Sequence, residues 1–102
     1  MVADADLQVW LDTQSQTGQT VVVPYVKSAQ DAQVSYRMDV IKRGKSGFSR
    51  VSQHGTVKAA AAAPTALSRL ALGVQTEDEC RIELVLRDGD HALGTYRFDC
   101  PR

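Results

Sequence analysis

Apolar and polar side chains alternate with a period of two along several stretches of the chain, most clearly in residues 33–43. One face of that stretch is apolar and is formed by Val34, Tyr36, Met38 and Val40. The other face is polar and carries Ser35, Arg37 and Asp39. Because successive side chains of a strand point to opposite faces, this alternation predicts a half-buried β-strand. Residues 7–12 alternate in the same way and predict the first strand.

Two further segments predict strands with interruptions. Residues 19–27 are rich in Val, but Pro24 cannot donate a ladder hydrogen bond, which predicts an edge segment or a bulge there. Residues 47–59 contain several glycines. We expect two short strands in this segment, joined by a tight turn near His54 and Gly55.

The middle of the chain is less regular. Residues 65–74 suit a helix face or a strand, and their position between strand-like segments favours a strand. The alanines of 59–63 end at Pro64 after about one turn, too short to nucleate a stable helix, so we expect 59–64 to be the end of a strand or a connector. Together the segments predict an all-β fold, an immunoglobulin-like antiparallel β-sandwich of about seven strands.

Residues 79–100, ECRIELVLRDGDHALGTYRFDC, predict a hairpin whose turn is centred on Asp90, with Asp88 facing Ala92. This register places Ile82 opposite Phe98 and Leu84 opposite Tyr96 on an apolar face. The other face then pairs Arg81 with Asp99 and Glu83 with Arg97, each pair worth about 0.2–1 kcal/mol. A slip of one residue would turn the apolar side chains to the polar face, so one register is favoured.

The same register places Cys80 opposite Cys100, which predicts a disulfide that stabilises the hairpin by about 3 kcal/mol in the chain-entropy model. A redox centre or a zinc site are the alternatives. The first would more often show a Cys-x-x-Cys motif, and the second would need two more ligands, for example His54 and His91. We expect no metal. A lasting disulfide requires an oxidising compartment, which predicts an extracytoplasmic protein.

Length and composition predict one compact domain with a modest core, because the chain has 102 residues, 43% hydrophobic and 24% charged. We expect residues 1–102 to form this single domain, with 1–6 as a flexible N-terminus of the mature protein. The net charge is zero and no RNP-like, zinc-finger or helix-turn-helix pattern occurs, so we expect no nucleic-acid partner. The apolar runs are too short for membrane insertion. No catalytic constellation stands out, so we expect no enzyme and no cofactor.

Charge is unevenly distributed along the neutral chain. Residues 40–76 carry six basic side chains and no Asp or Glu, whereas acidic side chains are in excess in both flanking segments. These basic groups either find acidic partners within the fold or form a basic face that attracts an acidic or polar partner. The candidate partner-binding residues are Lys42, Arg43, Lys45 and Arg50, with Arg37 as a weaker candidate because a neighbouring strand can pair with it.

Two stretches resemble a known family: VVVPYVKSAQDAQVSYRMDVIKRGKSGFSRVSQHGTV (21–57) and CRIELVLRDGDHALGTYRFDC (80–100). Over about residues 9–101 the chain resembles the curli-assembly inhibitors of the CsgC/CsgH family, specifically the CsgH branch. The Cys-x-Cys motif of the CsgC branch is absent here, which weakens any thiol-exchange role.

The resemblance implies an immunoglobulin-like periplasmic protein without enzymatic activity. It implies a chaperone-like inhibitor that keeps the unfolded curli major subunit from nucleating into amyloid fibres, through weak, electrostatically guided contacts. We expect a monomer. Two alternatives stay open: an extracytoplasmic immunoglobulin-like binding or adhesion module with another partner, and a thiol-disulfide partner domain.

Overall fold

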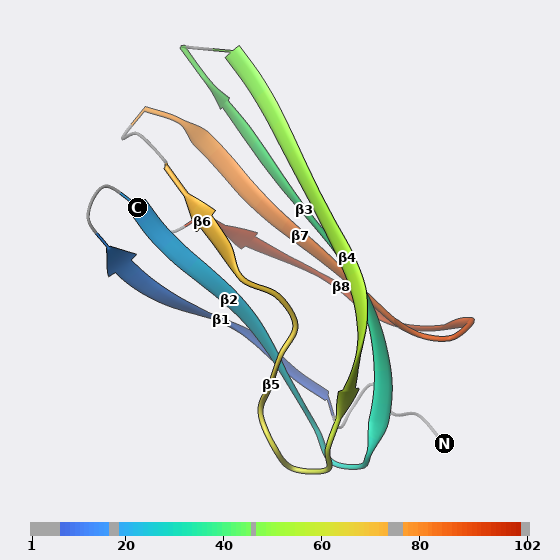
Figure 1. Ribbon diagram of the computed structural model, residues 1–102. Coiled ribbons are helices and arrows are strands. Elements are labelled where there is room, and N and C mark those ends of the chain that lie inside the picture. Colours follow the sequence, from blue (N-terminus) through green and yellow to red (C-terminus); the bar gives the residue numbers. More distant parts are fainter. Residues whose placement is uncertain (1–6, 17–18, 46, 74–76, 101–102) are drawn as a thin grey trace.

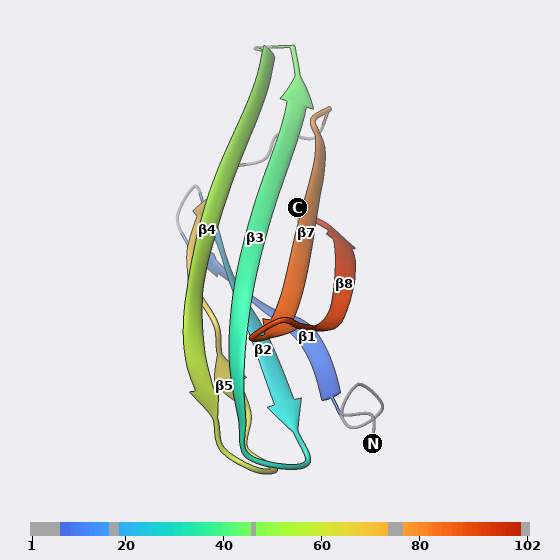
Figure 2. The ribbon, with the colours of Figure 1, turned by 90° about the vertical axis from the view of Figure 1, so that its right-hand side faces the viewer.

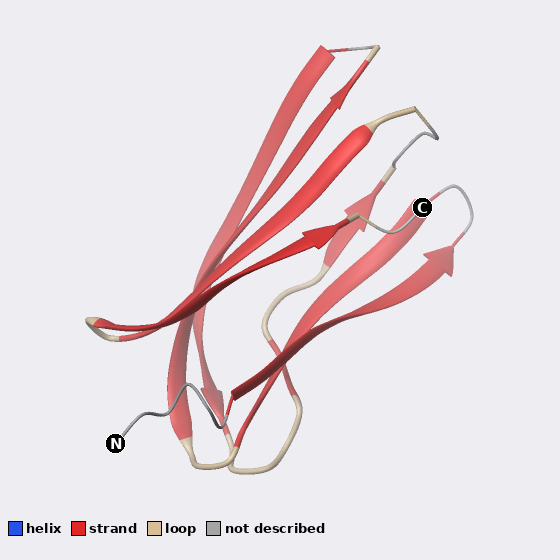
Figure 3. Cartoon of the chain, turned by 180° about the vertical axis from the view of Figure 1, so that it is seen from behind, coloured by secondary structure: helices blue, strands red, loops and turns tan. Residues whose placement is uncertain are grey.

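Strands dominate the computed structural model, which describes residues 7–16, 19–45, 47–73 and 77–100 (Figure 1). The strands are β1 (Leu7–Gln16), β2 (Gln19–Ser28), β3 (Ala32–Gly44), β4 (Gly47–Ala59), β5 (Thr65–Ala66), β6 (Leu70–Leu72), β7 (Glu79–Asp88) and β8 (His91–Asp99). Figure 3 shows strands joined by loops throughout these ranges. Among the described residues we find no helix with the length and apolar character that a membrane crossing requires.

The strands form two antiparallel sheets that pack face to face. One has the order β1-β2-β5, with β6 also paired to β2, and the other has the order β4-β3-β7-β8. Figure 2 looks onto the second sheet, with the first sheet behind it. The predicted all-β antiparallel sandwich is thus confirmed. The described residues contain eight strands instead of about seven, because the segment 65–74 contributes two short ones.

The core lies between the two sheets. Its most deeply buried side chains come from alternate positions of β2, β3 and β7: Val22, Val26, Val34, Met38, Ile82, Leu84 and Leu86. The apolar face that alternation predicts for residues 33–43 is therefore the inner face of β3. Tyr96 and Phe98 pack against this core from β8.

The tight turn predicted near His54 and Gly55 is wrong. β4 pairs with β3 in one uninterrupted register from Gly47 to Ala59, and Gly55 lies opposite Tyr36. A Cβ atom at residue 55 would lie 2.9 Å from the Tyr36 hydroxyl oxygen. The glycine therefore makes room for the Tyr36 ring, and it does not mark a reversal of the chain.

The single strand predicted for residues 65–74 is also wrong, since β5 and β6 are separate strands and Val74 lies outside the described residues. The gap between β5 and β6 explains why β2 tolerates a proline at residue 24. Its carbonyl accepts a hydrogen bond from Leu67 N at 2.9 Å, at the point where β2 has neither β5 nor β6 as a partner. Pro24 thus occupies a local edge, as predicted, and β2 pairs with β1 without a bulge.

The C-terminal hairpin has the predicted register over most of its length. Arg81 faces Asp99, Ile82 faces Phe98, Glu83 faces Arg97 and Leu84 faces Tyr96. Nearer the turn the prediction is wrong, because Asp88 faces His91 and the register shifts after Leu86. The irregularity leaves Leu93 without a register partner and lets its side chain enter the core, with an exposed fraction of 6%.

Candidate functional site

The outward side of the β4-β3-β7-β8 sheet is the most strongly charged surface that the register defines. Residues directly opposite each other on neighbouring strands share a face, so the pairings identify its members, and we call this surface the outer sheet face. The basic members are Arg37, Arg43, Arg50, Lys58, Arg81, Arg87 and Arg97, and the acidic members are Asp39, Glu79, Glu83 and Asp99. Basic groups therefore outnumber acidic ones on this face.

A buried carboxylate holds two of the arginines. Asp39 has a side-chain exposed fraction of 7%, and its Oδ2 lies 3.4 Å from both Arg37 Nε and Arg50 Nη2. Ser52 Oγ donates a hydrogen bond to Oδ1 of the same carboxylate. This hydrogen bond is the main cause that lowers the pKa of Asp39 below its ordinary value, and the two arginines lower it further against the opposing effect of burial. The carboxylate stays ionised and fixes both guanidinium groups, which remain more than half exposed.

Asp39→Asn is expected to lower the free energy of unfolding at neutral pH by roughly 1 kcal/mol, a modest loss because solvent screens the exposed arginines. A carboxyl with a lowered folded-state pKa stabilises the fold above its ordinary pKa of 3.8, and this contribution is lost as the pH falls below that value. Urea unfolding of both proteins at about pH 7 and about pH 3 measures the effect. The gap between them should shrink at the lower pH, and a constant gap would contradict the assignment.

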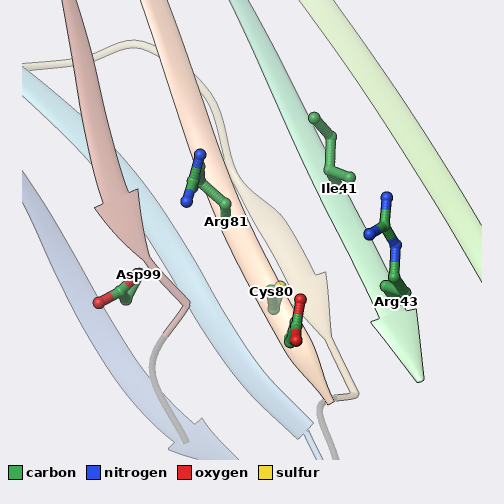
Figure 4. Close-up of a pocket in the computed structure, with 6 residues that line it drawn as sticks. Ile41, Arg43, Cys80, Arg81 and Asp99 are labelled. Atoms are coloured by element: carbon green, nitrogen blue, oxygen red, sulfur yellow. The ribbon is translucent and has the colours of Figure 1, made fainter.

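A second part of the outer sheet face lies toward the end where β7 begins. The Arg43 guanidinium lies over the Phe48 ring, 5.8 Å from its centroid. Next to it is an open hollow of about 580 Å³, lined by Ile41, Arg43, Glu79, Cys80, Arg81 and Asp99 (Figure 4). Arg43 and Arg81 come from neighbouring strands there, with Glu79 and Asp99 on the same face. The hollow is therefore polar and mixed in charge.

The structure separates the five residues that the sequence singled out. Arg37, Arg43 and Arg50 lie on the outer sheet face, but Lys42 lies on the opposite side of β3, where its Nζ donates to Gly73 O at 3.0 Å. Lys45 follows β3 and forms an ion pair with Glu77 at 3.1 Å. The prediction that Lys42, Arg43, Lys45 and Arg50 build one face is therefore wrong.

Sequence reasoning missed the basic residues that β7 and β8 add to the same face. Arg97 pairs with Glu83 at 3.0 Å, while Arg81 and Arg87 are exposed. The predicted hairpin register already placed Arg81 and Arg97 on its polar side. What joins them to Arg37 is the pairing of β3 with β7, which connects distant parts of the chain.

The two cysteines form the predicted disulfide, which closes the base of the β7–β8 hairpin. Their Cα atoms are 5.3 Å apart, and Cys100 N donates a hydrogen bond to Cys80 O at 3.2 Å. Both residues are buried within the core cluster. Within the described ranges, no group of three or more His, Cys, Asp or Glu side chains is arranged to hold a metal ion.

Comparison with known proteins places this arrangement among proteins of fimbriae and curli. The profile of the family described as thin aggregative fimbriae synthesis protein, Tafi-CsgC, matches residues 1–97. Curli assembly protein CsgC of Escherichia coli K12 is 26% identical over 89 residues, which cover 87% of this chain and 81% of that protein. The protein of the same name from Escherichia coli O1:K1 matches with the same identity and coverage.

Two solved structures share the fold. The structure of the curli protein CsgC of E. coli superposes with a TM-score of 0.75 at 24% identity and covers 94% of this chain and 99% of that one. The solution structure of CsgH of R. palustris has a TM-score of 0.73 at 20% identity and covers 91% of each chain. At these identities the two structures bear on the fold alone.

Proposed function

The chain belongs to the Tafi-CsgC family of thin aggregative fimbriae synthesis proteins, and on this premise we propose that it acts in curli assembly as a chaperone-like inhibitor of amyloid nucleation. The family resemblance expected from residues 21–57 and 80–100 is thereby confirmed. The proposed client is the unfolded curli subunit, and the proposed activity is binding without catalysis. The relatives named curli assembly protein support a role in curli assembly. The charged outer sheet face supports the proposal that the protein binds its client electrostatically.

The observation that carries the proposal is the set of exposed guanidinium groups held in place on the outer sheet face. Arg37 and Arg50 are oriented by the buried Asp39, and Arg43 by the ring of Phe48. Fixed positive charges attract an acidic or polar chain over about a Debye length and raise its encounter rate without requiring tight binding. A disordered client loses little conformational entropy by such contacts, because each contact is weak and short-lived.

Weak binding is sufficient for the proposed effect. Amyloid forms when enough strands stack to make a nucleus, and growth then follows by addition to exposed edges. A protein that briefly contacts the few client molecules gathering into a nucleus can prevent this rare event without occupying most of the client. The inhibitor is therefore expected to act below equimolar concentration, and to lengthen the lag more than it slows later growth.

We place the action in the periplasm, on the mature form of the protein. The Cys80–Cys100 disulfide supports this, because structural disulfides persist in oxidising compartments. The family resemblance implies action on the client before its secretion, and an inhibitor on that route would meet its client there.

The proposed function is tested by measuring the lag time of fibrillation of a curli subunit, with amyloid-dye fluorescence as the readout. The protein is added well below equimolar concentration, at one low and one high salt concentration. We expect the lag to lengthen several-fold at low salt and distinctly less at high salt, because salt screens the outer sheet face. An unchanged lag at both salt concentrations would reject the function and favour a binding or adhesion module with another partner.

A further inference from the structure

β4 is a border strand of the β4-β3-β7-β8 sheet and is paired along one side only within the described residues. Figure 2 shows it running along the margin of the sheet, beside β3. Thirteen residues from Gly47 to Ala59 form this strand. Its register with β3 has no shift, so the strand remains regular over its whole length. A long, regular border strand offers its outward backbone groups to another strand.

The hydrogen bond from Cys100 N to Cys80 O identifies which β4 groups point outward. In an antiparallel ladder the pairs alternate between bonded and non-bonded ones. Cys80 therefore directs its backbone groups to β8, Arg81 directs its groups to β3, and the alternation continues across the sheet through the registers. On β4 the outward N–H and C=O groups then belong to Phe48, Arg50, Ser52, His54, Thr56 and Lys58.

The other borders of the two sheets are less suited to accept a strand. β8 is interrupted by the register shift after Leu86, and the border opposite β1 is divided between β5 and β6. β1 is regular, but its charged residue is Asp12. In the described part of the chain, β4 alone combines a regular border with basic side chains and no acidic one.

Exposed apolar side chains also gather on this strand. Phe48 and Val51 have exposed fractions of 61% and 45%, and they are the exposed large hydrophobic residues of the described chain. A monomeric protein usually blunts such a border with charges or a bulge. β4 has no bulge, its charged residues Arg50 and Lys58 are both basic, and it presents apolar area on both of its faces, because Phe48 and Val51 point to opposite sides.

We propose that the border of β4 between Phe48 and Lys58 binds an extended, acidic polypeptide segment as an additional strand of the sheet. The outward backbone groups supply the hydrogen bonds, and the side chains select the segment. Arg50 and Lys58 lie on the same face, about 27 Å apart at roughly 3.4 Å per residue. They favour a segment with two carboxylates at the same spacing, polar side chains between them on that face, and apolar side chains beside Val51 and Val57.

Charge argues against a second copy of this chain as the occupant, because β4 has no acidic side chain and so offers no complementary charge to another β4 in any register. An antiparallel pairing of two β4 strands centred on His54 would place Arg50 opposite Lys58 of the other copy, and like charges in that position are destabilising. The inference deepens the proposed function, on which it rests for the nature of the client. It names the strand, the backbone groups and the charge pattern through which an unfolded client is held.

The test uses the full chain and a synthetic peptide that matches Arg50–Lys58 in length, Glu-Val-Thr-Val-Thr-Val-Thr-Val-Glu with blocked ends. Amide hydrogen exchange followed by NMR should slow at the outward amides of Arg50, Ser52 and His54 when the peptide is added. A peptide with Lys in place of both Glu residues should bind at least about tenfold more weakly. Slowing at β8 instead of β4, or equal binding of both peptides, would overturn the inference.

Two matched variants separate the border from the rest of the sheet. His54→Pro removes an outward N–H from β4 without removing a bond to β3, and Thr95→Pro makes the same change on the border of β8. We expect His54→Pro to weaken peptide binding at least about tenfold and Thr95→Pro to leave it unchanged. His54→Thr controls for the lost imidazole and should bind as the unmodified chain does. Equal affinity of His54→Pro and the unmodified chain would reject the inference.

Fibrillation assays with the unmodified chain and with His54→Pro distinguish a failure of the β4 proposal from a failure of the proposed function. If the unmodified chain lengthens the fibrillation lag and His54→Pro does so equally, the border inference fails and the inhibitory function stands. If the unmodified chain leaves the lag unchanged, the function fails, and the peptide measurements alone decide on the border. A dimer in sedimentation that His54→Pro dissolves would assign the border to a second copy and overturn the acidic segment as its occupant.

Discussion

Replacing Arg43 and Arg50 together by glutamine should remove most of the inhibition of curli-subunit fibrillation. Both guanidinium groups project from the outer sheet face. The Arg50 side chain is 51% exposed and is held by Asp39, and Arg43 is exposed and lies over the Phe48 ring. Their loss removes two fixed charges from one surface, which lowers the rate of encounter with a client. We expect the lag to return most of the way to its value without inhibitor, and its salt dependence to weaken.

The matched control is the glutamine variant of Lys42 and Lys45. It changes the net charge of the whole protein by the same amount, but Lys42 lies on the other side of β3 and Lys45 is paired with Glu77 beyond the end of that strand. This control should retain the inhibition. Equal losses in both variants would show that net charge matters and the outer sheet face does not. Glutamine is chosen because glutamate at residue 50 would place a like charge beside Asp39, and thermal unfolding of each variant checks that the fold is intact.

Reduction of the Cys80–Cys100 disulfide should lower the free energy of unfolding by about 3 kcal/mol, because the bond closes a segment with a sequence separation of 20. For a domain of this size the loss corresponds to a fall in Tm of about 12–24 °C. Urea unfolding with and without reductant measures it directly. The folded state should survive, since the β7–β8 register is also held by Ile82, Phe98 and their neighbours in the core.

The double variant Cys80→Ala, Cys100→Ala supplies the control for that measurement. Its unfolding should not respond to reductant and should resemble that of the reduced protein. If oxidised and reduced protein unfold at the same urea concentration, the disulfide is not the stabilising link that its position predicts. That result would favour the alternative of a thiol-disulfide partner domain, because a disulfide that does not stabilise the fold is more readily explained as a reactive bond.

The hairpin of residues 79–100 illustrates what local sequence can predict. Its two strands are joined by a short turn, and a shift by one residue would expose Ile82 and Leu84 and bury Arg81. The register was therefore predictable, and so was the disulfide. The prediction failed beside the turn, because it assumed strict alternation of inward and outward side chains. A bulge there shifts the register by one residue, and Leu93 enters the core.

The candidate site was less predictable, because it depends on pairings between distant segments. Alternation alone already implies that Lys42 and Arg43 point to opposite faces of one strand. It does not reveal that β3 pairs with β7, which brings Arg81 beside Ile41 and extends the basic surface. The burial of Asp39 is another result of packing. Its carboxylate contacts Arg37, Arg50 and Ser52, and the last two lie on the neighbouring strand.

The sequence by itself determined the all-β class, the inward faces of the main strands and the C-terminal hairpin with its disulfide, because a period of two and a short turn constrain neighbouring residues directly. The tertiary structure decided which strand lies at each border, which arginines share a face and which carboxylate is buried beneath them. These features depend on the order of strands within a sheet. That order is set by the combined packing of the whole core, and no local pattern of residues carries it.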